Sequence, residues 1–84
     1  MYRIEVARSA LKSLARIPQP YQRRIRDRIR TLATNPRPPG VKKLRGDRDY
    51  YRIRIGDYRV LYTVNDKERI VRIAVIAHRR EAYR

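Results

Sequence analysis

Two runs in which apolar and cationic residues alternate constrain the fold of this chain more than any other feature. The runs are Tyr50–Ile55 and Tyr58–Tyr62, with Gly56 and Asp57 between them. A period of two is typical of a β-strand, whose successive side chains point to opposite faces of a sheet. A two-residue connection that contains glycine predicts a tight hairpin, because glycine readily adopts a positive φ. The sequence therefore predicts an antiparallel strand pair with one apolar face and one face that carries arginines.

Two helices are predicted in the first half of the chain. Ser9 suits the N-cap of a short helix that ends before Pro18. The residues of this helix expected to face the core are Leu11, Leu14 and Ala15. Pro20 suits the first turn of a second helix. The apolar stripe of that helix, at helical spacing, consists of Tyr21, Ile25, Ile29 and Leu32.

Four strands are predicted to form the sheet. Alternation at residues 2–6 indicates the first, and Lys42–Leu44 is expected to begin the second, whose main body is Tyr50–Ile55. Residues 58–64 form the third, a turn covers 65–68, and residues 69–77 form the fourth. The fourth is apolar on both faces, as is typical of a central strand. The order strand–helix–helix–strand–strand–strand predicts a single α+β domain over residues 1–84. Its two N-terminal helices pack on a four-stranded, mainly antiparallel sheet, and a short C-terminal segment follows.

The charge of the chain favours anionic partners. Its 84 residues include 23 Lys and Arg against 8 Asp and Glu, which gives a formal net charge of +15. A field of this strength attracts polyanions and raises their association rate. The chain has no cysteine, which excludes disulfides and thiolate metal sites. Neither a signal peptide nor a membrane span is recognisable, so a cytoplasmic location without membrane contact is expected.

Four segments, in this order, resemble the RelE family of toxin–antitoxin systems. They are Lys43–Gly46, Tyr51–Ile55, Tyr58–Tyr62 and the tail His78–Arg84. The resemblance covers essentially the whole chain, including the order of its elements. It implies an endoribonuclease that enters the ribosomal A site and cleaves mRNA there, inhibiting translation. It also implies a cognate antitoxin, expected to be small and acidic, that holds the toxin silent.

The residue types favour RNA cleavage without a metal or another cofactor. In such a reaction the 2′-hydroxyl attacks the adjacent phosphorus, assisted by a proton acceptor, by cations and by an acid for the departing oxygen. A metal route needs several converging carboxylates or histidines. This chain has only one histidine, and its acidic residues are scattered along the sequence.

The resemblance implies a catalytic role for four arginines around the scissile phosphate. They are Arg52, Arg54, Arg59 and Arg80. The first two stand where the best-known relative carries lysines. Arginine anchors phosphate well but stays protonated, so it is a poor proton acceptor.

His78 is the expected substitute for the missing proton acceptor. Histidine titrates near neutrality, and the surrounding arginines would favour its neutral form. The alternative is a structural histidine at the end of a core strand. Tyr83 resembles the C-terminal tyrosine of the family, which stacks on a base or assists proton transfer.

Other cations are expected to bind RNA without catalysing its cleavage. Lys42, Lys43 and Arg45 are expected to contact backbone phosphate without reading sequence. A solvated face of the second helix that touches rRNA consists of Arg23, Arg26 and Arg30. The tyrosines expected to pack in or around the core, rather than to stack on bases, are Tyr51, Tyr58 and Tyr62.

Two other function classes remain open at this point. The ParE-like branch shares the fold and poisons DNA gyrase, although its members generally lack the full set of basic active-site residues. A noncatalytic RNA-binding module is the other alternative, since the net charge alone would support it.

Overall fold

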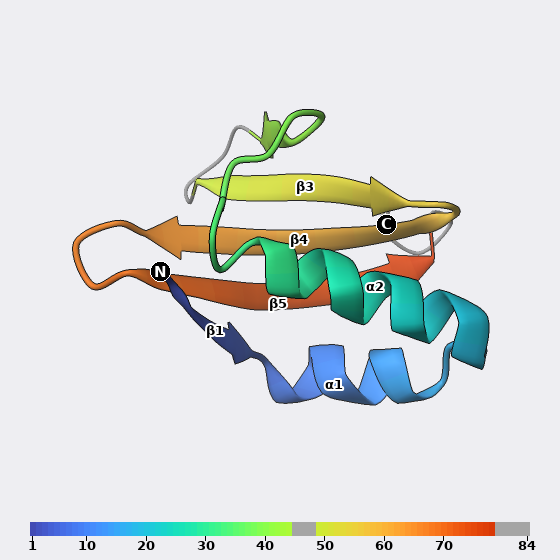
Figure 1. The fold of residues 1–84 in the computed structure, drawn as a ribbon. Coiled ribbons are helices and arrows are strands. Elements are labelled where there is room, and N and C mark those ends of the chain that lie inside the picture. The colour runs from blue at the N-terminus through green and yellow to red at the C-terminus, as the bar shows by residue number, and fades with distance from the viewer. Residues whose placement is uncertain (45–48, 79–84) are drawn as a thin grey trace.

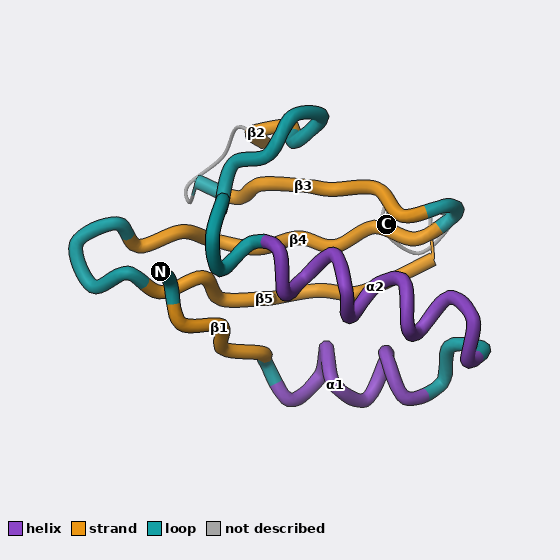
Figure 2. The backbone as a smooth tube through the Cα atoms, in the orientation of Figure 1, coloured by secondary structure: helices purple, strands orange, loops and turns teal. Residues whose placement is uncertain are grey.

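The computed structural model describes residues 1–44 and 49–78 of the chain (Figures 1 and 2). The expected C-terminal segment, with Arg80 and Tyr83, lies outside the described residues, as does Arg45. The helices are α1 (Arg8–Ala15) and α2 (Gln19–Thr31). The strands are β1 (Arg3–Val6), β2 (Lys42–Leu44), β3 (Tyr50–Ile55), β4 (Tyr58–Asn65) and β5 (Ile70–His78).

The sheet has five strands in the order β1-β5-β4-β3-β2, and both helices lie on one of its faces (Figure 1). β1 runs parallel to β5, whereas the other neighbours are antiparallel, so the sheet is mixed. The predicted helix layer is confirmed, but the four-stranded sheet is wrong. Lys42–Leu44 does not begin the strand of Tyr50–Ile55, because it pairs with it antiparallel, Lys42 opposite Arg52.

The predicted hairpin and its two faces are confirmed. Gly56 has φ +59° in the turn between β3 and β4, a backbone conformation that residues with a side chain rarely adopt. Ile53 and Ile55 are buried toward the helices, whereas Arg54 is exposed. Alternation along β3 thus separates the core from a cationic surface.

A β-bulge explains the continuous apolar run of β5. Leu61 of β4 pairs with Val75, but the next residue, Tyr62, pairs with Ile73, so Ala74 is left over. The extra residue shifts the alternation, and Ile73 and Ile76 are both fully buried although three positions separate them. β5 lies between β1 and β4, which confirms its prediction as a central strand.

α1 begins earlier than predicted. Its N-cap is Ala7, no side chain caps it, and Ser9 lies inside the helix. The earlier start puts Ala10 and Leu14 on the core side, one helical turn apart. Leu11 is 51% exposed and Ala15 is also exposed, so their predicted burial is wrong.

α2 follows the prediction except at Tyr21, the first residue of its predicted apolar stripe. Pro20 lies in the first turn, and Ile25, Ile29 and Leu32 are buried, whereas Tyr21 is 41% exposed. Gln22 is buried instead, and its Nε2 donates a hydrogen bond of 2.9 Å to the carbonyl oxygen of Leu14. This bond fastens the end of α1 to the start of α2. Neither helix is long and apolar enough to span a membrane.

Candidate functional site

The face of the sheet opposite the helices carries a group of cations, which we call the arginine face. It consists of Lys42, Arg52, Arg54 and Arg59. Lys42 lies opposite Arg52, and Arg54 lies opposite Arg59 on the neighbouring strand. Residues paired across strands point to the same side of a sheet. The three predicted catalytic arginines of β3 and β4 therefore share one surface.

The arginine face brings like charges close together. Neighbouring strands lie about 4.8 Å apart, and like charges directly opposite each other destabilise a sheet. Arg54 is exposed and Arg52 is half-buried, whereas Arg59 is only 2% exposed. A phosphate in solution can therefore contact Arg54 directly, whereas Arg59 is shielded from solvent.

An apolar strip crosses the arginine face. Leu61 lies opposite Arg52, and Val75 of β5 lies opposite Leu61. Val75 is 39% exposed, which is high for an apolar side chain on a central strand. The surface thus combines cations with apolar area, which suits a ligand that has both phosphates and flat bases.

His78 lies on the other face of the sheet. It pairs with Tyr58, and their rings meet edge to face at 5.4 Å between centroids. Tyr58 in turn contacts Tyr21 of α2 at 5.6 Å, which places this group on the helix side. Arg59 pairs instead with Ala77, so alternation separates His78 from the three arginines. The expected position of His78 among Arg52, Arg54 and Arg59 is wrong.

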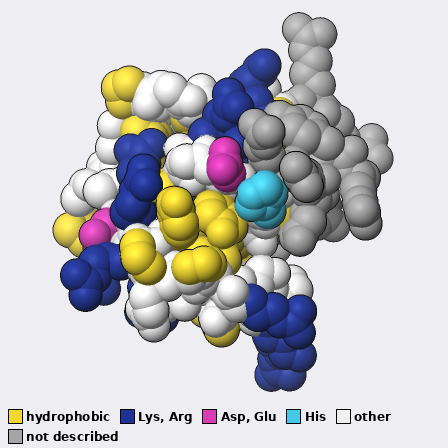
Figure 3. Space-filling view, turned by 90° about the vertical axis from the view of Figure 1, so that its right-hand side faces the viewer, with side chains coloured by type: hydrophobic (Ala, Val, Ile, Leu, Met, Phe, Trp, Pro, Cys, Tyr) yellow, Lys and Arg dark blue, Asp and Glu magenta, His cyan; other side chains and the backbone are white. Residues whose placement is uncertain are grey.

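A small pocket of about 230 Å³ surrounds His78 at the end of the sheet where β3 turns into β4. α1 and the residues after it contribute Ser13, Arg16 and Ile17, and the sheet contributes Tyr58. Figure 3 shows the single histidine of the chain at this end, beside an acidic side chain and next to a group of hydrophobic ones. His78 is half-buried, so solvent reaches it.

The other predicted RNA-binding residues are spread over both layers. Lys43 pairs with Tyr51, whose side chain faces the helices, and its Nζ lies 3.8 Å from an oxygen of Asp49. As predicted, α2 exposes Arg23, Arg26 and Arg30, and Arg24 is exposed as well. They lie on the helix layer, so the structure does not bring them to the arginine face. Within residues 1–44 and 49–78, no acidic or histidine side chains gather in a group that could hold a metal ion.

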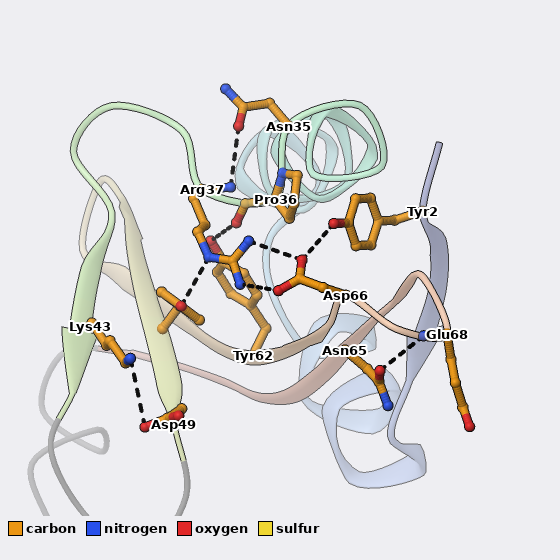
Figure 4. Close-up of polar contacts among 11 residues, drawn as sticks. Tyr2, Asn35, Pro36, Arg37, Lys43, Asp49, Tyr62, Asn65, Asp66 and Glu68 are labelled. Atoms are coloured by element: carbon orange, nitrogen blue, oxygen red, sulfur yellow. Dashed lines mark hydrogen bonds and ion pairs between the residues drawn. The ribbon is translucent and has the colours of Figure 1, made fainter.

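A polar cluster that the sequence did not predict ties together the opposite end of the sheet (Figure 4). The Arg37 guanidinium donates to both carboxylate oxygens of Asp66, at 3.1 and 2.8 Å, and to the hydroxyl of Tyr51 at 2.9 Å. The hydroxyl of Tyr2 donates to the same carboxylate at 2.5 Å. These bonds lower the pKa of Asp66 to about 2, with Arg37 as the main cause. We call Tyr2, Arg37, Tyr51 and Asp66 the Arg37 cluster.

Tyr62 extends this end of the structure into the core. Its side chain is fully buried, and its hydroxyl donates to the Pro36 carbonyl oxygen at 2.7 Å. Burial raises the pKa of Tyr62 to about 12. Its ring stacks on that of Tyr51 with 5.7 Å between centroids. The predicted packing roles of Tyr51 and Tyr62 are confirmed.

Comparisons with known proteins agree with this fold. A model of the ParE toxin of type II toxin–antitoxin systems (parDE) matches residues 4–83. The candidate toxin RelE1 of Methanocaldococcus jannaschii is 36% identical over 86 residues, covering 99% of this chain and 96% of the relative. RelE in the RelE–RelB complex of Pyrococcus horikoshii superimposes with a TM-score of 0.84 at 35% identity, covering 93% of this chain and 94% of that one.

The fold recurs in a more distant bacterial protein. In the intact Escherichia coli RelBE toxin–antitoxin complex the TM-score is 0.80 at 24% identity, over 93% of this chain and 96% of that one. Together the fold and the matches define a toxin of a type II toxin–antitoxin system. The chain belongs to the RelE/ParE family and is a RelE-type toxin.

Proposed function

We propose that this toxin is an endoribonuclease that cleaves mRNA in the ribosomal A site without a metal ion. The observation that carries the proposal is the arginine face, where Arg54 and Arg59 lie directly opposite each other on neighbouring strands. Two guanidinium groups on the same face of the sheet can bind the oxygens of one phosphate group. The RelE-type family membership makes RNA the natural source of that phosphate.

The arginines suit the charge that develops during the reaction. When the 2′-hydroxyl attacks phosphorus, negative charge grows on the non-bridging oxygens, and guanidinium groups bind these oxygens through two parallel hydrogen bonds. Arg54, which is exposed, is proposed to bind the phosphate first, and the buried Arg59 is proposed to stabilise the same group from the neighbouring strand. Arg52 and, from outside the described residues, Arg80 are proposed to stabilise the same charge.

The proton of the 2′-hydroxyl needs a separate acceptor. We propose that His78 is this acceptor. The RNA then passes over the end of β5, from the arginine face to the face of the sheet that carries His78. The pocket at His78 gives solvent access there. Tyr83 is proposed to stack on a base or to assist the proton transfer.

Further cations are proposed to hold the ribosome. Lys42, Lys43 and Arg45 are assigned to backbone phosphates. Three exposed arginines of the helix layer are assigned to rRNA: Arg23, Arg26 and Arg30. Such contacts add affinity and salt dependence without adding sequence specificity.

The partner that silences the toxin is proposed to be a small acidic antitoxin. Solved relatives from Pyrococcus horikoshii and Methanococcus jannaschii are RelE–RelB complexes. Carboxylates of an antitoxin would neutralise the cations of this chain, and apolar anchors would hold the complex together. High salt should therefore slow association strongly but leave a formed complex intact.

One experiment separates this proposal from two alternatives. The purified toxin is incubated with translating ribosomes, with naked mRNA, and with DNA gyrase plus DNA. We expect clear mRNA cleavage on ribosomes and slow or no cleavage of naked RNA, because the ribosome supplies the near-attack geometry that the toxin lacks. Equal rates on free and ribosome-bound mRNA would contradict ribosome dependence.

Gyrase poisoning is the second candidate because the matching family model is that of the ParE toxin. Accumulation of cleaved DNA with gyrase, and intact mRNA on ribosomes, would establish it in place of RNA cleavage. RNA binding without cleavage in any of the three reactions would identify a binding module instead.

A further inference from the structure

A groove beside the arginine face runs between α2 and the β3–β4 hairpin. Its volume is about 300 Å³, and the residues that line it are Arg24, Asp27, Arg28, Arg54, Ile55 and Gly56. Arg24 and Arg28 are four residues apart on α2, so their side chains lie on the same side of the helix. The groove therefore collects three guanidinium groups from two separate elements.

Arg54 connects this groove to the arginine face. β2 pairs with β3 only as far as Arg52, so the part of β3 that includes Arg54 has no partner on that side within the described residues. Register places Arg54 on the arginine face opposite Arg59, yet it also lines the groove. A ligand bound at Arg54 can thus follow positive charge around the edge of the sheet onto α2.

The lining of the groove favours phosphate over a protein segment. Its one carboxylate, Asp27, has an ion pair with Arg30 at 3.6 Å, and Arg30 does not line the groove. Three guanidiniums against one carboxylate leave a net positive charge. Ile55 is the one apolar side chain of the lining, whereas peptides that dock in grooves need several apolar anchors.

We propose that Arg24 and Arg28 bind a phosphodiester of the RNA that flanks the scissile one. This inference rests on the proposed function, since it assigns Arg54 to the scissile phosphate and extends the same strand. The groove positions the RNA, and its arginines touch no reacting atom. Arg24 and Arg28 are therefore positioning residues, which the sequence analysis did not single out.

The test measures RNA binding separately from cleavage. The double variant Arg24→Gln/Arg28→Gln is compared with Arg8→Gln/Lys12→Gln, which removes two exposed cations at the same spacing on α1. Glutamine preserves helix propensity in both pairs. The probe is a short single-stranded 2′-O-methyl RNA, which cannot be cleaved by 2′-hydroxyl attack, and binding is followed by fluorescence anisotropy at several salt concentrations. Thermal unfolding of each variant verifies that the fold persists.

We expect the groove variant to bind about tenfold more weakly and to show a shallower dependence of affinity on salt. One lost phosphate contact changes the slope of log K against log salt by about 0.7 for single strands. The α1 variant should keep the slope of the wild type. If the two variants have equal slopes and affinities, the groove does not bind RNA and the inference is overturned.

The outcomes also separate this inference from the proposed function. A shallower dependence of RNA affinity on salt in the groove variant, together with a wild type that cleaves no mRNA on ribosomes, would support RNA binding by the groove. The same result would contradict the proposed endoribonuclease activity. If the wild type cleaves and both variants bind the probe equally, the activity stands and the groove assignment fails. Loss of affinity for an acidic antitoxin alone, with RNA binding unchanged, would assign the groove to the antitoxin and also overturn the inference.

Discussion

Two ends of the same sheet use arginine in opposite ways. In the Arg37 cluster one guanidinium is matched by a carboxylate and a tyrosine hydroxyl, with distances of 2.8–3.1 Å. On the arginine face Arg54 and Arg59 face each other across neighbouring strands. The first arrangement joins opposite charges, whereas the second brings like charges together.

This difference separates structural from functional arginines in a chain that has many of them. Arg37 fastens the segment after α2 to the β4–β5 turn, and Asp66 also receives a bond from Tyr2 near the first strand (Figure 4). Such a pair needs no external ligand. The arginine face gathers like charges on one side of the sheet and is the surface proposed to bind phosphate, so removing one of its charges should affect activity more than stability.

The largest expected effect is the loss of cleavage in Arg59→Ala. Removing one preorganised cation from a transition-state site typically costs about 10²–10³ in rate. We expect this loss in single-turnover cleavage of ribosome-bound mRNA, with the folded state retained in thermal unfolding. The matched control is Arg37→Ala, which removes an arginine from the other end and should cleave at the wild-type rate. Equal activity of Arg59→Ala and wild type would place the active site elsewhere.

A smaller effect is expected for His78→Ala. A general base contributes about 10²–10⁴ in rate, and we expect the lower end because His78 lies on the face opposite the arginines. Ribosome affinity should change less than the rate, which single-turnover cleavage and ribosome binding measured on the same variant would show. A variant with full activity would leave His78 with a purely structural contact to Tyr58.

The sequence predicted those parts of the fold that depend on neighbours along the chain. Alternation identified the hairpin and assigned Arg54 to the surface, and helical spacing identified the buried Ile25 and Ile29. The same alternation indicates that Ala77 and His78, as neighbours in one strand, point to opposite faces of the sheet. The expected position of His78 among the arginines did not follow this alternation.

Long-range contacts were not predictable in the same way. Arg37 and Asp66 are 29 residues apart, and Arg37 and Tyr51 are 14 apart, so no local spacing links them. The groove next to Arg54 depends on how α2 packs against the hairpin, which side-chain volumes decide. The bulge at Ala74 likewise depends on the register between two strands and not on one strand alone.

A moderate loss of stability is expected for Tyr62→Phe. The substitution leaves the Pro36 carbonyl oxygen without the hydrogen bond of 2.7 Å that the buried hydroxyl donates. Loss of a buried partner typically costs about 1–3 kcal/mol. Urea unfolding at neutral pH should show this decrease in the free energy of unfolding, while cleavage per folded molecule stays at the wild-type rate. A loss of activity without a loss of stability would mean that this end of the sheet belongs to the active site.

The smallest effect is expected from the charge of Asp66. Its pKa is about 2 in the folded protein, below the ordinary value of an aspartate, so the carboxylate form is favoured by folding. This contribution to folding stability is fully present at pH values above the ordinary pKa of an aspartate, and it is lost as the pH falls through about 2. Arg37 and Asp66 keep 41% and 57% of their side-chain surface exposed, so solvent and salt screen the pair and the change should be small.

The comparison that isolates this contribution is the difference in unfolding free energy between wild type and Asp66→Asn. The difference should be constant from neutral pH down to about 4 and should shrink as the pH approaches 2, because both proteins then carry a neutral side chain at position 66. Acid titration of the other carboxylates is common to both proteins and cancels. The arginine face is the same in both proteins, so it does not contribute to the difference. A difference that stays unchanged down to pH 2 would show that the Arg37 cluster depends on hydrogen-bond geometry and not on charge, and the contrast between the two ends of the sheet would then no longer be electrostatic.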